Sequence, residues 1–222
     1  RTIVVISSDI VTTEAFPERL NASGWRDGMA VSDSRTLVNY CRTTPDGRIA
    51  SGTGGGMLSY GNRVTPKFSG GSSRSEEVAG YFRRIYPDFR DIGIASHWTG
   101  PIDRSLSGLP FFGRLGGRAD IVFGLGFSGN GVGPTLIGAK ILASLVLNER
   151  DEWSECGLVR DGIGQFPREP LRYFSGGMVI KANRRKEALE DQGKTPGALT
   201  RYFAKLAPAG LVPVKGIGAP DD

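Results

Sequence analysis

The residues best suited to chemistry form a glycine-rich turn, Gly124-Leu125-Gly126-Phe127-Ser128-Gly129-Asn130-Gly131-Val132-Gly133-Pro134. The turn follows an expected strand over residues 119–123 and opens an expected helix over residues 134–147. Its glycines permit positive φ and close approach of a ligand to the backbone. The unpaired N–H groups of a helix start favour an anion or a polarised carbonyl. The turn is therefore either a ligand contact or only a tight connection between a strand and a helix.

Gly124, Gly126 and Gly129 also match the G-x-G-x-x-G dinucleotide fingerprint. That fingerprint belongs in a parallel βαβ unit, with an acid about twenty residues further on after a second strand. Here residues 149–154 are polar and do not form a convincing strand, so the sequence does not predict a self-contained Rossmann domain. Ser128 is not centred in a G-x-S-x-G elbow either, which argues against a serine hydrolase.

Four further side chains are candidates because of their type and position. His97 is the only histidine, and it could orient an amine or influence its protonation, or be an ordinary strand histidine that bonds to the backbone. Trp98 beside it, and Tyr60 after a run of glycines, could line a substrate cavity or pack in the core. Asp103 is expected either to pair with its neighbour Arg104 and fix a loop or to act in the site.

These residues need elements that bring them together. Residues 2–6 and 91–99 are expected strands, and residues 37–42 and 48–52 are an expected hairpin around the turn at residues 44–47. Residues 17–27 are rich in turn formers. Ser73 and Glu76 suggest a capping box before an amphipathic helix that ends at Pro87. Hairpins mixed with a few helices predict an α+β fold with a mainly antiparallel sheet.

The C-terminal part is expected to be helical, at residues 169–191 and 198–206. Gly176 and Gly177 should weaken the middle of the first of these helices. The sequence thus predicts a substrate-binding sheet domain over residues 1–125, a turn and helix over residues 126–150, and a helical extension over residues 151–222.

Composition narrows the class of protein. The chain has 222 residues, with 39% hydrophobic and 23% charged residues and a net charge of +5, as in an ordinary globular protein. Basic and acidic residues alternate, so nucleic acid is not the expected partner. Cys41 and Cys156 are isolated and a single histidine gives no metal pattern, so no metal is expected. No apolar run is long enough to span a membrane. The two isolated cysteines favour a reduced, cytoplasmic protein.

Three segments together resemble the D-amino-acid oxidase superfamily of FAD-dependent oxidoreductases, which includes glycine, sarcosine and γ-glutamylputrescine oxidases. Gly126 to Gly131 is similar to the family's late turn against the flavin. Trp98 to Arg104, followed by Leu109 to Gly113, resembles the stretch that precedes it. The opening strand and the hairpin resemble the antiparallel substrate domain, and the resemblance covers about residues 1–150. The C-terminal extension looks most like that of γ-glutamylputrescine oxidase or aminophosphonate oxidoreductase.

The resemblance implies FAD as cofactor and a small-molecule amine as substrate. It implies that FAD contacts Gly126, Phe127, Ser128, Gly129, Asn130, Gly131 and Val132. His97, Trp98 and Tyr60 are the candidates for residues that face the substrate. The enzyme would oxidise a C–N bond by hydride transfer to the flavin, with dioxygen as the acceptor. An alternative is a dehydrogenase that uses another acceptor, and a further alternative is a cofactor-free module that binds anions.

Several features depart from the family's pattern. Gly133 stands where sarcosine-oxidase-like members carry a lysine for the substrate carboxylate, which favours an amine whose acid group lies elsewhere. Ser96 stands where some relatives attach the flavin through cysteine, so FAD is expected to bind non-covalently. The chain begins at Arg1 without methionine and lacks the family's N-terminal fingerprint for the ADP part of FAD. We therefore expect an N-terminal FAD-binding half before Arg1, without which this chain is inactive.

Overall fold

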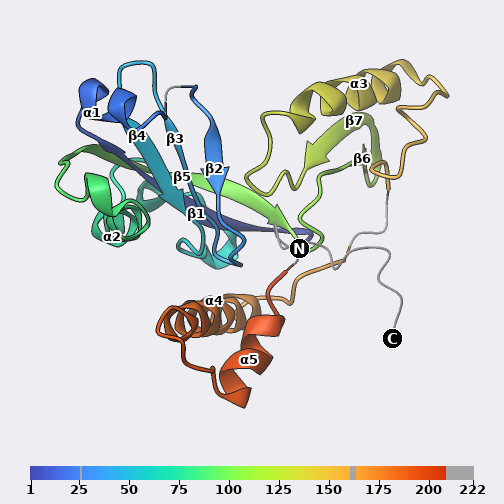
Figure 1. Ribbon diagram of the computed structural model, residues 1–222. Helices are drawn as coiled ribbons and strands as arrows, with labels where there is room; N and C mark the ends of the chain where they lie inside the picture. Colours follow the sequence, from blue (N-terminus) through green and yellow to red (C-terminus); the bar gives the residue numbers. More distant parts are fainter. Residues whose placement is uncertain (26, 161–163, 209–222) are drawn as a thin grey trace, which may run out of the picture.

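The structure is a computed structural model that describes residues 1–25, 27–160 and 164–208. Figure 1 shows three groups of elements: a five-stranded sheet with two helices, a two-stranded sheet with one helix, and a pair of C-terminal helices. The N-terminus lies where the three groups meet. The α+β class and the mainly antiparallel sheet predicted from the sequence are confirmed.

The larger sheet has the order β2-β3-β4-β1-β5, and each neighbouring pair is antiparallel. The expected hairpin is present between β3 and β4, and β5 is longer than predicted because it pairs with β1 along nearly the whole of both strands. The strands are β1 (Ile3–Thr13), β2 (Ala30–Ser32), β3 (Asn39–Thr43), β4 (Ile49–Thr53) and β5 (Ile94–Ser105).

One face of this sheet is covered by α1 (Pro17–Ala22) and α2 (Ser75–Ile85). The side chains of β1 alternate between the faces, and the set that includes Val11 is buried on the α2 side. Apolar residues from helices, strands and loops complete this core, namely Phe16, Leu20, Cys41, Ile49, Phe82 and Phe89.

Two predictions about this region were wrong. Residues 17–22 form α1 rather than a turn, because Pro17 suits the first helical position and Leu20 is buried in the core. The predicted capping box is absent, since α2 begins at Ser75 without a side-chain cap. Ser72, and not Ser73, accepts the N–H of Arg74 and also donates to the buried carboxylate of Asp9, so a core ion-pair network determines this helix start.

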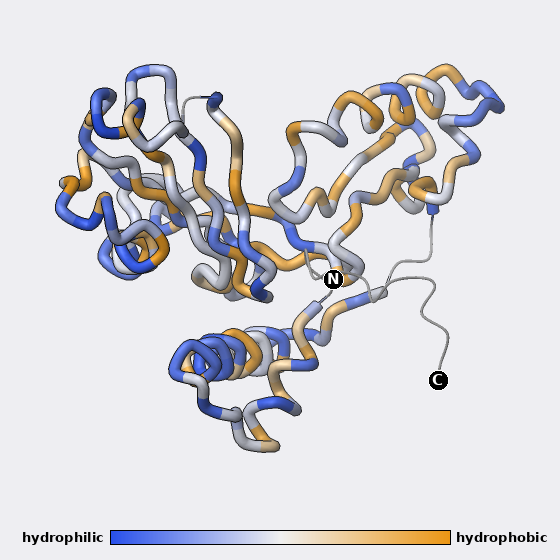
Figure 2. The backbone as a smooth tube through the Cα atoms, in the orientation of Figure 1, coloured by the Kyte–Doolittle hydropathy of each residue, from blue (hydrophilic) through white to orange (hydrophobic). Residues whose placement is uncertain are grey.

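The second group consists of β6 (Phe111–Leu115), β7 (Arg118–Leu125) and α3 (Pro134–Leu147). Phe112, Ile141 and Leu145 form its buried core. The helix is apolar on most of its circumference, and Figure 2 shows most of it in hydrophobic colours. Its other face is uncovered, with Leu136, Val146 and Leu147 exposed.

The third group is the C-terminal helical hairpin, which we define as α4 (Leu171–Glu190) and α5 (Ala198–Lys205). Both helices were predicted, but the expected weakness at Gly176 and Gly177 is absent, since α4 is continuous through them. The buried side chain of Asn183 joins the two helices, because its Nδ2 donates to the carbonyl of Ala204.

The predicted division at residues 125 and 150 remains a prediction, and residues 161–163 and 209–222 of the proposed helical extension lie outside the described residues. No helix in the parts that the structure describes is long and apolar enough to cross a membrane. Short 3-10 turns complete the chain at Tyr60–Asn62, Pro66–Phe68 and Pro87–Phe89.

Candidate functional site

The glycine-rich turn connects β7 to α3 and is fastened to the end of β5. The backbone N–H of Gly126 donates to Asp103 Oδ2, and the N–H of Ser128 donates to the Asp103 carbonyl over 3.0 Å. Ser128 Oγ accepts the N–H of Ser105 over 3.2 Å. These bonds hold Ser128 at a φ of +56°, which residues other than glycine adopt infrequently. The turn is therefore a fixed part of the sheet edge.

Close packing explains some of the glycines in this segment. A Cβ on Gly124 would lie 2.5 Å from Phe112 Cε1, and a Cβ on Gly138 would lie 2.9 Å from Phe112 Cζ. The Phe112 ring thus leaves no room for a side chain at Gly124. Gly129 is different, because its φ is +89° and the nearest atom to an added Cβ is 3.5 Å away. The later part of the turn keeps its backbone accessible.

The start of α3 presents backbone donors. Among the described residues, the N–H groups of Gly129, Gly131, Val132 and Gly133 have no hydrogen-bond partner. The N–H of Asn130, by contrast, donates to the Phe127 carbonyl over 2.9 Å. Available N–H groups at a helix start attract negative charge and polarised carbonyls. This arrangement suits the carbonyl-bearing edge of a bound ring.

The alternation of β5 separates two predicted site residues. Trp98 pairs with Ile10 and His97 pairs with Val11, and neighbouring residues on a strand point to opposite faces. His97 therefore lies on the α2 face, with its Cε1 3.2 Å from the position that a Cβ on Gly71 would take. Trp98 lies on the other face and is 40% exposed. The structure does not bring these two side chains together.

Tyr60 lies elsewhere, in the turn after β4. Its ring is about half exposed and contacts the ring of Tyr173 on α4 edge to face, with centroids 5.6 Å apart. Its neighbour Leu58 lines the cavity described next, whereas Tyr60, His97 and Trp98 do not.

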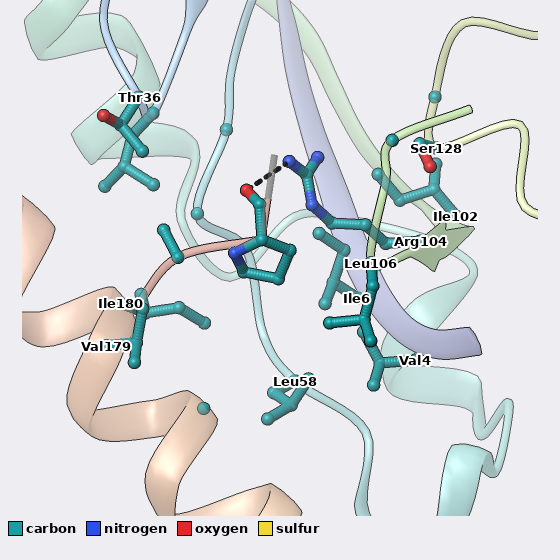
Figure 3. A pocket seen from close by; sticks show the side chains of 18 of the residues that line it. Val4, Ile6, Thr36, Leu58, Ile102, Arg104, Leu106, Ser128, Val179 and Ile180 are labelled. Atoms are coloured by element: carbon teal, nitrogen blue, oxygen red, sulfur yellow. Dashed lines mark hydrogen bonds between the residues drawn. The ribbon is translucent and has the colours of Figure 1, made fainter. Parts of the chain in front are cut away.

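A cavity of about 1070 Å³ lies between the sheet face opposite α2, the glycine-rich turn and the C-terminal helical hairpin. Apolar side chains form most of its wall, and Figure 3 shows several of them. They come from β1, β5, the segment after β4, and α4: Val4, Ile6, Ile10, Leu58, Ile102, Val179 and Ile180. The turn contributes Phe127, Ser128, Gly129 and Asn130. A mostly apolar cavity with a few polar groups is typical of a small-molecule site.

The polar groups of this cavity lie at defined places. The hydroxyls of Ser8 and Tyr40 are 2.9 Å apart, and burial raises the pKa of Tyr40. Gly52 makes room for this ring, since a Cβ there would lie 2.3 Å from Tyr40 Cζ. Tyr40 is therefore a neutral hydrogen-bonding group in the cavity wall.

Arg104 is the charged side chain that β5 contributes to the cavity. Its Nη2 donates to the Pro208 carbonyl over 3.4 Å, as Figure 3 shows. Burial lowers the pKa of Arg104, but a guanidinium still carries its charge at neutral pH. Asp103 and Arg104 do not pair as expected, because their side chains point to opposite faces of β5. Asp103 fixes the turn, and Arg104 faces the cavity.

The C-terminal helical hairpin is held over the sheet by polar contacts at one end of α4. Glu187 Oε1 accepts the N–H of Leu37 over 3.0 Å, and Arg184 Nη2 donates to the Gly55 carbonyl over 2.8 Å. Asp191 forms ion pairs with Arg35 and Arg84. Figure 1 shows the hairpin lying below the sheet.

The opposite end of α4 is also fixed. Arg172 is buried and forms an ion pair of 2.7 Å with Glu169, whose Oε1 also accepts the N–H of Gly61 over 2.8 Å. Between the two ends, Gly176 allows a close approach, because a Cβ there would lie 2.6 Å from Leu58 Cδ2. The hairpin thus forms one wall of the cavity. Sequence reasoning did not anticipate this wall or the orientation of Arg104.

Residues 1–145 match the family model described as FAD dependent oxidoreductase (DAO). The chain is 28% identical over 185 residues to the probable oxidoreductase OrdL of Haemophilus influenzae and 28% identical over 174 residues to the gamma-glutamylputrescine oxidoreductase of Escherichia coli. These matches cover 82% and 78% of the chain, and the chain spans 36% of the length of each relative.

Solved structures share the fold. Glycine oxidase from Geobacillus kaustophilus matches with a TM-score of 0.54 and 15% identity, over 73% of this chain and 40% of that one. Amadoriase I, the fructosyl amine:oxygen oxidoreductase of Aspergillus fumigatus, matches with a TM-score of 0.56 and 11% identity, over 71% and 38%. At these identities the likeness concerns the fold alone. The family match covers well over half of the chain, and the chain belongs to the DAO family of FAD-dependent oxidoreductases.

Proposed function

We propose that this chain supplies the substrate cavity and the flavin-contacting turn of an enzyme that oxidises the C–N bond of a small amine, with dioxygen as the electron acceptor. The observation that carries this proposal is the position of the turn. Its available N–H groups at the start of α3 include that of Gly129, which lines the mostly apolar cavity, and Asp103 holds the turn against β5, which forms part of the cavity wall.

The residues of the turn fit a non-covalently bound FAD. The N–H groups of Gly129, Gly131 and Val132 are suited to the ring edge that becomes more negative on reduction, where preorganised donors are most effective. When bound, FAD supplies the two-electron acceptor for a hydride from the carbon beside the nitrogen. The protein's own part is to orient that carbon, to keep water out and to hold the turn in place.

The apolar surface of α3 supports a second part of this proposal. Leu136, Val146 and Leu147 are exposed, although a helix that is apolar on most of its circumference belongs in a protein interior. We infer that a further part of the polypeptide covers this face and holds the rest of FAD. On its own, this chain would then bind FAD weakly and would not oxidise an amine.

Catalytic roles for His97, Trp98 and Tyr60 remain predictions. None of the three lines the cavity, and His97 lies on the opposite face of the sheet. Substrate orientation is better supported by the Ser8 and Tyr40 hydroxyls and by the shape of the cavity. The proposed function therefore depends on the turn and the cavity.

The test uses the whole polypeptide that contains this chain, purified with FAD. A panel of primary and secondary amines is added without oxygen while the visible spectrum is recorded, and air is then admitted while peroxide is measured. Bleaching followed by peroxide release is the expected result. If only an artificial electron acceptor reverses the bleaching, the enzyme is a dehydrogenase and not an oxidase. A protein that binds no flavin would overturn the proposal.

A further inference from the structure

Four charged side chains form a continuous series of ion pairs that runs from the core of the sheet to α4. The carboxylate of Asp9 is fully buried and accepts a hydrogen bond from Arg74 Nη1 over 2.9 Å. Arg74 also donates to both carboxylate oxygens of Glu77, over 2.9 Å each. Glu77 Oε1 in turn lies 3.6 Å from Arg184 Nη2 on α4. The charges alternate in sign, and we define these four residues as the ion-pair series.

Both arginines of the ion-pair series also bind the segment that follows β4. Arg74 Nη2 donates to the Gly54 carbonyl over 3.3 Å, and Arg184 Nη2 donates to the Gly55 carbonyl over 2.8 Å. Gly54 and Gly55 line the cavity, whereas none of the four charged residues does. The ion-pair series therefore lies behind the cavity wall and connects α2 to α4 at these two glycines.

This contact lies at the end of the cavity that is far from the glycine-rich turn. Leu37 and Ile180 both line the cavity there. A Cβ on Gly55 would lie 2.9 Å from Leu37 Cδ2, and Ile180 precedes Arg184 by one turn of α4. Figure 3 shows Ile180 on the opposite side of the cavity from Ser128, which belongs to the turn. A substrate that reacts beside the turn therefore reaches this end only if it is long.

Glu77 is the link between the two halves of the ion-pair series. Without it Arg74 keeps Asp9 as a partner, but in the described part of the chain no other acid forms an ion pair with Arg184. The hydrogen bond from Arg74 lowers the pKa of Glu77, so its carboxylate is charged at neutral pH. Water and salt screen a partly buried pair less than an exposed one. Loss of this carboxylate would leave the Arg184 guanidinium with the Gly55 carbonyl alone.

We propose that Glu77 is a positioning residue, which through Arg184 holds α4 against Gly55 and thereby sets the length of substrate that the cavity accepts. This inference rests on the proposed amine oxidation and concerns the same cavity. Glu77 itself contacts neither the substrate nor the flavin. When its carboxylate is removed, the wall around Ile180 fits the far end of a long amine less closely. Short amines do not reach this end and are not affected.

The experiment compares Glu77→Gln with Glu76→Gln in the whole FAD-loaded protein. Both glutamates lie in the first turn of α2, but Glu76 is a suitable control because its side chain is 92% exposed and lies 4.0 Å from Arg83, outside the ion-pair series. Linear primary amines from ethylamine to decylamine measure the dependence on chain length. In Glu77→Gln we expect KM for the long amines to rise by roughly three- to tenfold, with kcat and the KM for short amines unchanged. Glu76→Gln should match the original protein.

Variants of Arg184 separate positioning from a general loss of folding. Arg184→Lys keeps a cation for Glu77 and should retain most of the affinity for long amines, whereas Arg184→Gln should not. The double variant with Glu77→Gln should resemble Arg184→Gln alone, because both changes remove the same ion pair. Thermal unfolding verifies that each variant is folded. KM values that rise equally for short and long amines, or single effects that add in the double variant, would overturn the inference.

Hydrogen exchange gives a readout that does not depend on oxidation. In Glu77→Gln the backbone amides of α4 around Arg184 should exchange about threefold faster or more, while those around Arg172 and those of Glu76→Gln keep their rates. Faster exchange around Arg184, in a protein whose flavin no amine reduces, would support the role of Glu77 in holding α4 and overturn the amine oxidation. Amine oxidation with unchanged exchange in Glu77→Gln would support the proposed function and overturn the inference.

Discussion

The carboxylate of Asp103 accepts the backbone N–H of Gly126, and this bond is one of those that join β5 to the glycine-rich turn. The carbonyl of Asp103 accepts the N–H of Ser128 as well, so one residue of β5 holds two points of the turn. The position of the donors at the start of α3 relative to the cavity therefore depends on Asp103.

Removal of this carboxylate should weaken FAD binding. Asp103→Ala leaves the Gly126 N–H without its charged partner, and we expect the Kd for FAD to rise about tenfold or more. Asp103→Asn keeps an acceptor and should show a smaller rise. The Kd is measured by flavin fluorescence in the whole polypeptide, with thermal unfolding as the check on folding. A folded Asp103→Ala protein that binds FAD like the original would contradict this role.

Two neighbouring glycines of α4 provide a matched test of the cavity wall. Gly176 lines the cavity and faces Leu58, whereas a Cβ on Gly177 would have no atom within 4 Å. Both substitutions to leucine change helix propensity equally. We expect Gly176→Leu to raise KM for the longest substrates by roughly tenfold through lost cavity volume, and Gly177→Leu to leave KM unchanged. Equal KM values in both variants would show that α4 does not bound the substrate.

Packing of the Phe112 ring gives a prediction about stability. Gly124→Ala places a Cβ 2.5 Å from this ring and should lower the free energy of unfolding by about 1–3 kcal/mol. Gly116→Ala is the control, because a Cβ there meets no atom within 4 Å and its φ is not positive. Urea unfolding measures both variants. A Gly124→Ala protein as stable as the control would show that this glycine is not required for packing.

Two acids near the end of α4 should respond to pH with opposite signs. Burial raises the pKa of Glu187, so its charged form is disfavoured in the folded protein and stability is lost as the pH rises through that pKa. The hydrogen bond from Arg35 lowers the pKa of Asp191, so its charge contributes stability above about pH 4, and this is lost as the pH falls.

Amide variants separate the two effects. Glu187→Gln keeps an acceptor for Leu37 and should raise the melting temperature at pH 7, with the gain vanishing toward pH 4. Asp191→Asn should lower the melting temperature at pH 7, with the loss likewise shrinking in acid. Thermal unfolding between about pH 2 and pH 8 measures both, since the Asp191 effect is lost only below about pH 4. Changes of the same sign in the two variants at pH 7 would contradict the assignment.

Local sequence signals predicted most of the elements but not their arrangement. The hairpin between β3 and β4, and the start of α3 at Pro134, follow from turn residues and from helix-start chemistry that act over a few positions. The continuous α4 was not foreseen at Gly176, because contact with Leu58, which is distant in sequence, offsets the low helix propensity of glycine.

The candidate site was predictable only where its residues are contiguous in the sequence. The glycine-rich turn is contiguous in sequence, so its chemistry could be read directly. His97 and Trp98 were expected on one wall, but the two-residue period of β5 separates them. The same period places Arg104 on the face of Trp98, but the expected strand ended at residue 99, and its extension to Ser105 depends on the pairing with β1. The cavity wall formed by the C-terminal helical hairpin depends on long-range contacts such as Glu187 with Leu37, which no local pattern indicates.

The most direct test of the central claim is the visible spectrum of the whole polypeptide during an anaerobic titration with amines. The account predicts a bound-flavin spectrum whose absorbance near 450 nm disappears in proportion to an added amine, as flavin chemistry requires. A protein that remains colourless after incubation with FAD would contradict it. A bound flavin that no amine bleaches would agree with membership of the family but would contradict the proposed oxidation of a C–N bond.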